Sequence, residues 1–187
     1  MGFSCTVLLL ALSISFTHFF HNPLVFANGD AGLIQRTCKT TKYYDLCVSS
    51  LKSDTTSLKA DTKGLAVIMV KVGIANATAT GTYLSSQVLS KAANDTSVKK
   101  LFKECADRYS YSNESLQSSL HDLAAESYDY AYVHVMAASD YPNACHNAFK
   151  RYPGLAYPPE LAAREDGFKH ICDVVMGIID TLGSLSF

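Results

Sequence analysis

The sequence predicts an all-α fold: an antiparallel four-helix bundle with a small N-terminal helical extension, held by two disulfides. Residues 82–141 contain neither Gly nor Pro, so the strongest breakers of regular structure are absent from a long stretch. An all-β chain of this size would need a turn signal about every 8–12 residues. Apolar residues also recur at steps of three and four along several segments, which is the spacing of one face of a helix.

The N-terminal 27 residues are predicted to be a secretory signal peptide. They carry no Lys, Arg, Asp or Glu, contain an apolar run at residues 7–12, and end in Val25-Phe26-Ala27, which suits signal peptidase. An N-myristoylation pattern at Gly2 is disfavoured, because such anchors are not normally followed by an apolar region and a cleavage site. Residues 28–187 then form one domain. The sequons that could be glycosylated in the secretory pathway are Asn76, Asn94 and Asn113.

The apolar spacing predicts three long helices. Short helices are expected before them in the chain, within residues 32–53. The long helices are expected near residues 62–89, 97–126 and 159–183, the last opened by Pro158-Pro159-Glu160 and closed by Gly183. The first helix should bury Leu65, Ile68, Met69, Val72, Ala75, Ala79 and Tyr83. The second should bury Val98, Leu101, Phe102, Cys105, Tyr109, Ser112, Leu116, Leu120 and Leu123. The third should bury Phe168, Ile171, Cys172, Val175, Ile178, Ile179 and Leu182.

The segment from Tyr128 to Lys150 supports two interpretations. Tyr128, Tyr130 and Tyr132 alternate with other residues, a period of two that is typical of a strand. A lone strand would have no pairing partner in an otherwise helical chain. Helical spacing is also present, so we expect the fourth long helix here, with Pro142 bending or interrupting it. Its core side chains should be Ala131, Val135, Ala138, Cys145 and Phe149.

Cysteine usage also indicates secretion. One of the six cysteines lies in the signal peptide, and the odd number that remains implies two bridges and one free thiol. These residues can pair in many ways, but Cys38 and Cys47 are close in the sequence, and Cys172 lies among apolar residues of a helical pattern. The pairing that we favour is Cys38–Cys47 and Cys105–Cys145, with Cys172 as the free thiol.

No familiar motif for catalysis is present. The chain lacks G-x-S-x-G, H-E-x-x-H, C-x-x-C and a Gly-rich phosphate loop, so we expect no enzymatic activity, no cofactor and no metal. His170 and Cys172 are two residues apart, and a helix would direct them to different faces. The acidic pairs that could be assigned acid/base roles, but that we expect to be solvated helix ends, are Glu126 with Asp129 and Glu165 with Asp166.

The charge balance and the hydropathy favour neither nucleic acid nor a membrane as a partner. The chain has 16 Lys and Arg against 17 Asp and Glu, a net charge of -1, without a run of five like charges. A basic face for nucleic acid is therefore not expected. After residue 27 there is no window of 18 apolar residues, so we expect no membrane span.

Tyrosine is concentrated in one part of the chain. Four of the 11 tyrosines, at 128, 130, 132 and 141, fall near a predicted helix junction, with Asp129 and Asp140 among them. Tyrosine is common at interface hot spots because it offers a large contact area at low entropic cost. Some of these rings could instead pack into the bundle, and both interpretations stay open. The functional hypothesis is a protein-binding surface at one end of the bundle.

Two segments near the start of the mature domain have a distinctive order. They are Leu33-Ile34-Gln35-Arg36-Thr37-Cys38-Lys39-Thr40-Thr41 and Tyr43-Tyr44-Asp45-Leu46-Cys47, followed by Leu51. They resemble the opening signature of the plant invertase inhibitor and pectin methylesterase inhibitor family, whose later cysteines match Cys105, Cys145 and Cys172. The resemblance covers about residues 30–187. It implies a four-helix bundle with an N-terminal helical hairpin.

The stretch 128–149 and the tail 151–180 resemble the branch named cell wall/vacuolar inhibitors of fructosidase. In invertase-binding members a Pro-Lys-Phe segment enters the substrate cleft of the enzyme, and it corresponds here to Tyr128-Asp129-Tyr130. Tyr130 shares only the aromatic character, and Asp129 replaces the Lys. A carboxylate-bearing cleft would repel Asp129 unless it is protonated or turned away. The target-binding residues that we therefore expect are Tyr128, Asp129, Tyr130 and Tyr132.

The resemblance implies a secreted inhibitor that blocks an acid invertase (β-fructofuranosidase) in the apoplast, cell wall or vacuole. The alternative target is pectin methylesterase, which the faces of the bundle helices would contact. A third possibility, from a different class, is a structural wall or storage protein without an enzyme target.

Overall fold

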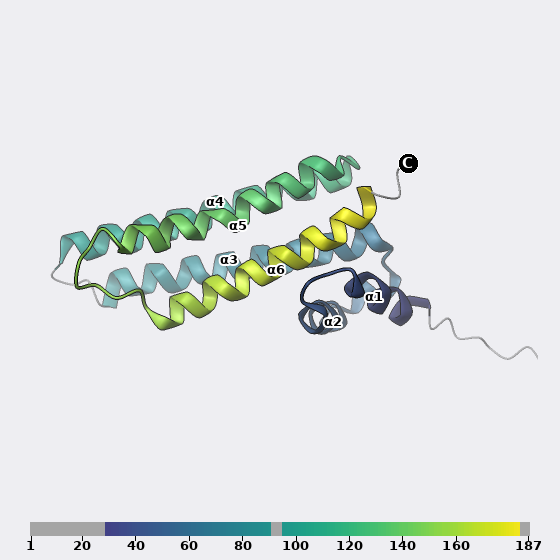
Figure 1. Cartoon of the computed structure of the whole chain (residues 1–187), viewed down its shortest axis with the longest axis horizontal. Coiled ribbons are helices and arrows are strands. Elements are labelled where there is room, and N and C mark those ends of the chain that lie inside the picture. Colours follow the sequence, from purple (N-terminus) through teal and green to yellow (C-terminus); the bar gives the residue numbers. More distant parts are fainter. Residues whose placement is uncertain (1–28, 91–94, 184–187) are drawn as a thin grey trace, which may run out of the picture.

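The computed structural model describes residues 29–90 and 95–183. Six α-helices and one short 3-10 helix make up this part of the chain, and the expected all-α class is confirmed. The long helices are α3 (Thr62–Ser90), α4 (Thr96–Ala124), α5 (Tyr128–Phe149) and α6 (Pro159–Gly183). The N-terminal hairpin is α1 (Gly29–Lys39) and α2 (Tyr44–Ser53), and η1 (Thr55–Lys59) connects it to α3. Figure 1 shows the long helices side by side, with the hairpin at one end of the bundle. The predicted signal peptide and Asn94 lie outside the described residues.

The faces predicted for α4, α5 and α6 form most of the bundle core. All seven residues expected on α6 are buried, as are all five expected on α5. On α4 only Val98 and Leu120 are half-buried rather than buried. The strand interpretation of residues 128–150 is wrong. Ala131, Val135 and Ala138 are fully buried at helical spacing, and this outweighs the period of two in the tyrosines.

The face predicted for α3 is correct only in its first half. Leu65, Ile68 and Met69 are buried, but Ala75 and Ala79 are exposed. The core is continued by Gly73, Ala77, Thr80 and Leu84. A Cβ added at Gly73 would lie 3.0 Å from Leu116 Cδ1, so α3 approaches α4 closely there. Except for Asn76, residues 75–82 of α3 are Ala, Thr and Gly, whose hydropathy contrasts too weakly to define a face.

Helix α3 bears on the expectation that the chain has no membrane span. Within its residues 62–87, an 18-residue window has a mean hydropathy of 1.4 and passes a test of length and composition for a membrane span. In the structure this segment packs in the bundle between α4 and α6, with 44% of its most apolar window buried. The apolar composition is that of a core helix.

Helix α5 continues through Pro142 because a neighbouring helix satisfies the backbone. Proline has no N–H, so the carbonyl four residues earlier, at Ala138, loses its helical donor. The Ser112 hydroxyl of α4 donates to that carbonyl over 2.9 Å, and both residues are fully buried. The expected interruption at Pro142 is therefore not observed.

Two disulfides join neighbouring helices as predicted. Cys38–Cys47 links α1 to α2, and Cys105–Cys145 links α4 to α5. Cys172 is free and buried in α6. The hairpin in turn rests on α6, where a Cβ at Gly177 would lie only 3.2 Å from Thr41 Cα.

Ser112→Ala should lower the free energy of unfolding by about 1–3 kcal/mol, because it leaves the buried Ala138 carbonyl without a donor. Pro142→Ala restores the missing N–H, so Ser112→Ala should cost less in that background. A double-mutant cycle by denaturant unfolding measures this coupling. Ser119→Ala is the control, because its hydroxyl is buried without a hydrogen-bond partner in the described structure. Equal costs of Ser112→Ala in both backgrounds would contradict this account of Pro142.

Cys172 should resist alkylation in the folded protein. Its side chain is fully buried, and burial raises the pKa of the thiol to about 12, so little thiolate forms near pH 8. Iodoacetamide at pH 8 should modify Cys172 only after denaturation, as followed by mass spectrometry without reductant. Rapid modification of the native protein would contradict the burial of this thiol.

Candidate protein-contact site

The corner between α4 and α5 is short and tied to a third helix. Only residues 125–127 separate the two helices, and Glu126 adopts a positive φ of 57° at the turn. The backbone N–H of Ser127 donates to the Asp122 carbonyl over 2.9 Å. The Lys63 ammonium of α3 donates to the Glu126 carboxylate over 2.7 Å. These contacts fix the direction in which α5 leaves the corner.

Beyond the corner, α5 presents an apolar outer face, here called the corner surface: Tyr130, Tyr132, Val133 and Met136. Tyr130 is 69% exposed, more than any other large hydrophobic side chain in the described structure. Val133 and Met136 are also about half exposed. These exposed apolar side chains fall within two turns of one helix, and such a concentration is typical of an interaction site.

A hollow of about 730 Å³ lies beside the corner surface, between the start of α5 and the end of α6. Its lining combines aromatic and aliphatic side chains with carboxylates. The lining residues are Glu126, Ser127, Tyr128, Asp129, Tyr130, Tyr132, Val133, Ile179, Asp180 and Gly183.

The four residues expected to bind a target do come together here. Tyr128, Asp129, Tyr130 and Tyr132 all line the hollow, and Tyr128 is half-buried while Tyr130 points to solvent. Tyr141 does not belong to this group, because it lies about 16 Å further along α5. Its ring packs instead against Tyr111 of α4, with 5.6 Å between ring centroids.

The sequence did not reveal the contribution of α6 to this site. Ile179 was expected in the core, where it is buried, yet it also forms part of the wall of the hollow. Asp180 is exposed at the next position. No local pattern links residues 179–183 to residues 126–133, because their proximity arises only from the antiparallel packing of α5 and α6.

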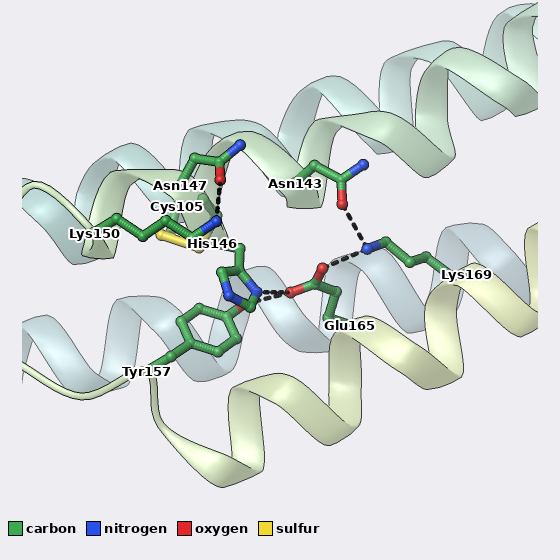
Figure 2. Close-up of polar contacts among 9 residues, drawn as sticks. Cys105, Asn143, His146, Asn147, Lys150, Tyr157, Glu165 and Lys169 are labelled. Atoms are coloured by element: carbon green, nitrogen blue, oxygen red, sulfur yellow. Dashed lines mark hydrogen bonds and ion pairs between the residues drawn. A yellow bond between two sulfur atoms is a disulfide. The ribbon is translucent and has the colours of Figure 1, made fainter.

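One of the carboxylates expected at a solvated helix end is in fact buried. Glu165 is 4% exposed on α6 and accepts hydrogen bonds from the Tyr157 hydroxyl, over 2.7 Å, and from the Lys169 ammonium. His146 of α5 lies 3.5 Å from the same carboxylate and stacks on Tyr157. Figure 2 shows these side chains converging between α5 and α6. Burial and the adjacent Glu165 raise the pKa of Tyr157 well above its usual range.

The Glu165 cluster joins three parts of the chain rather than forming an open reaction site. Tyr157 comes from the α5–α6 connection, and Lys169 also donates to Asn143 of α5 over 2.6 Å. The cluster therefore holds the connection and both helices together. Glu126 and Asp129, the other acidic pair, are exposed as expected. The described residues contain no group of three or more His, Cys, Asp or Glu that could hold a metal ion.

The two sequons within the described residues lie in the middle of helices. Asn76 in α3 and Asn113 in α4 are both half-buried. The Asn113 amide donates to the hydroxyl of Thr78, which is itself part of the Asn76 sequon. Glycosylation of these asparagines stays a prediction.

Glu165→Gln should lower the free energy of unfolding by about 1–3 kcal/mol, because the buried bonds from Tyr157 and Lys169 lose their charged acceptor. Glu160→Gln on the same helix is the control. It removes an exposed pair with Arg164 and should cost about 0–1 kcal/mol. Thermal and denaturant unfolding measure both. Equal stability of the two variants would show that the cluster does not hold the α5–α6 connection.

Comparison with known proteins supports the family resemblance. Residues 32–178 match the family described as plant invertase/pectin methylesterase inhibitor. A protein of Arabidopsis thaliana named cell wall/vacuolar inhibitor of fructosidase 2 is 47% identical, over 96% of this chain and 98% of its own length. A pectinesterase inhibitor of Oryza sativa subsp. japonica is 39% identical, over 82% of this chain and 70% of its own length.

A solved structure supports the fold. The crystal structure of a mutant pectin methylesterase inhibitor from Arabidopsis superposes with a TM-score of 0.61 at 22% identity, covering 76% of this chain and 92% of the other. All these relatives bear the names of inhibitors, in agreement with the expectation that the chain is not an enzyme. The family match, the identities and the helical bundle lead to one conclusion: the chain belongs to the plant invertase/pectin methylesterase inhibitor family.

Proposed function

We propose that this chain inhibits an acid invertase by binding it stoichiometrically and covering its substrate cleft. The observation that carries the proposal is the 47% identity to an inhibitor of fructosidase, which extends over nearly the full length of both chains. The pectinesterase inhibitor of Oryza sativa is less similar, and it matches a smaller share of this chain.

The corner surface supports the proposal because it is exposed and held in a fixed position. Tyr130 projects at the end of the bundle, where a side chain can enter a cleft that a flat helix face could not reach. The short α4–α5 turn and the Lys63–Glu126 ion pair hold this corner in place. A preformed contact surface loses little conformational entropy on binding.

Pectin methylesterase is the second candidate target. It is favoured by the 39% identity to a pectinesterase inhibitor and by the bundle shared with solved pectin methylesterase inhibitors. In that mode the flanks of the helices, rather than the corner surface, would make the contact.

We further propose that the protein acts in the apoplast, cell wall or vacuole after passage through the secretory pathway. The predicted signal peptide and the name of the Arabidopsis relative support this location. The two disulfides suit an oxidising compartment.

Purified protein should inhibit a purified acid invertase at a molar ratio near one, measured at acidic pH by release of glucose from sucrose. A purified pectin methylesterase, assayed in parallel, should keep its activity. Inhibition of the esterase alone would support the second candidate. No effect on either enzyme would favour a structural wall or storage role.

Tyr130→Ala should weaken binding to invertase by about 2 kcal/mol or more, near the threshold for an interface hot spot. The melting temperature should not change, because the ring is mostly exposed. Tyr44→Ala, which truncates an exposed tyrosine on the hairpin, is the control and should bind as the wild type does. A loss of stability without a specific loss of binding would place the Tyr130 ring in the fold rather than in the contact.

A further inference from the structure

The hollow beside the corner surface is both aromatic and acidic. Tyr128, Tyr130 and Tyr132 line it together with three carboxylates, and none of its lining residues is basic. Ile179 and Val133 add apolar wall. A site of this composition differs from an ordinary apolar groove, because its charge selects among the side chains that could fill it.

Two of the three carboxylates are uncompensated. Glu126 is paired with Lys63, whose ammonium lies 2.7 Å from it. Asp129 and Asp180, by contrast, are exposed and have no ion-pair partner within the described residues. They come from α5 and α6 and contribute negative charge to the same hollow. A cation entering there would gain attraction from both without displacing an existing partner.

We propose that this hollow accepts a lysine or arginine side chain of the enzyme that the protein inhibits. The inference rests on the proposed function and specifies the chemistry of the contact. The aliphatic part of such a side chain would pack on Ile179 and the tyrosine rings, while its charge would lie near Asp129 and Asp180. Tyrosine faces also attract cations directly.

This assignment gives Asp129 a role in the contact with the enzyme. An acidic residue at this position would be repelled by the carboxylates of an invertase cleft. With a basic residue of the enzyme beside the cleft as its neighbour, Asp129 becomes attractive, and Tyr130 remains free to reach the cleft. The two arrangements predict opposite effects of a positive charge at position 129.

The test measures the affinity of the full chain for a purified acid invertase by calorimetry. Asp129→Lys and Asp180→Lys should each weaken binding at least about tenfold, because like charges then meet across the interface. Asp180→Asn should weaken binding less, because it removes the attraction without adding repulsion. Asp166→Lys makes the same change of charge on an exposed residue of α6, about 21 Å away along the helix, and should alter affinity less than about twofold.

Each outcome supports or overturns the assignment. Tighter binding of Asp129→Lys would show that the position faces carboxylates, and would overturn the inference while leaving invertase inhibition intact. Unchanged binding of Asp180→Lys, or an equal loss with Asp166→Lys, would also overturn it. If the wild type binds only pectin methylesterase, the proposed target is wrong. The affinities of the same variants for that enzyme then show whether the hollow is part of the contact. If the wild type binds neither enzyme, both proposals fall.

Discussion

The pairing of α4 with α5 is the constraint on which the rest of the structure depends. Helix α5 must bury a narrow face of small residues, among them Ala131 and Ala138, against α4. The hydrogen bond from Ser112 to the Ala138 carbonyl fixes this pairing near the middle of α5. The Cys105–Cys145 disulfide fixes it towards the end of α5. Once that face is buried, helical geometry turns Tyr130, Val133 and Met136 outwards. The proposed contact surface is therefore a consequence of how the core is packed.

Most of the fold could be predicted because its helices differ strongly in hydropathy from one face to the other. Helix α6 is the clearest case, since every expected core residue is buried. Helix α3 could be placed but its second half could not be oriented, because Ala75 and Ala77 have the same side chain and only packing against α4 and α6 distinguishes them. The burial of Glu165 could not be predicted, because its charge suggests solvent and its partners Tyr157 and His146 lie outside its own helix.

Only the part of the candidate site that α5 contributes could be predicted from the sequence. The tyrosine-rich segment identified the α5 half of the hollow, because its composition is unusual at the level of the sequence alone. Asp180 carries no such signal, and it meets Asp129 only through the antiparallel packing of α6 against α5. The electrostatic character of the site therefore belongs to the tertiary structure.

The central claim is that this protein binds its target through the α4–α5 corner and the adjoining end of α6. Amide hydrogen exchange, compared between the free protein and its complex with an acid invertase, tests that claim most directly. Exchange should slow on binding within residues 126–136 and 179–183, and should change little in the middle of α3 and α4. Protection confined to the flanks of α3 and α4, with the corner unchanged, would contradict the account and favour contact through the helix faces.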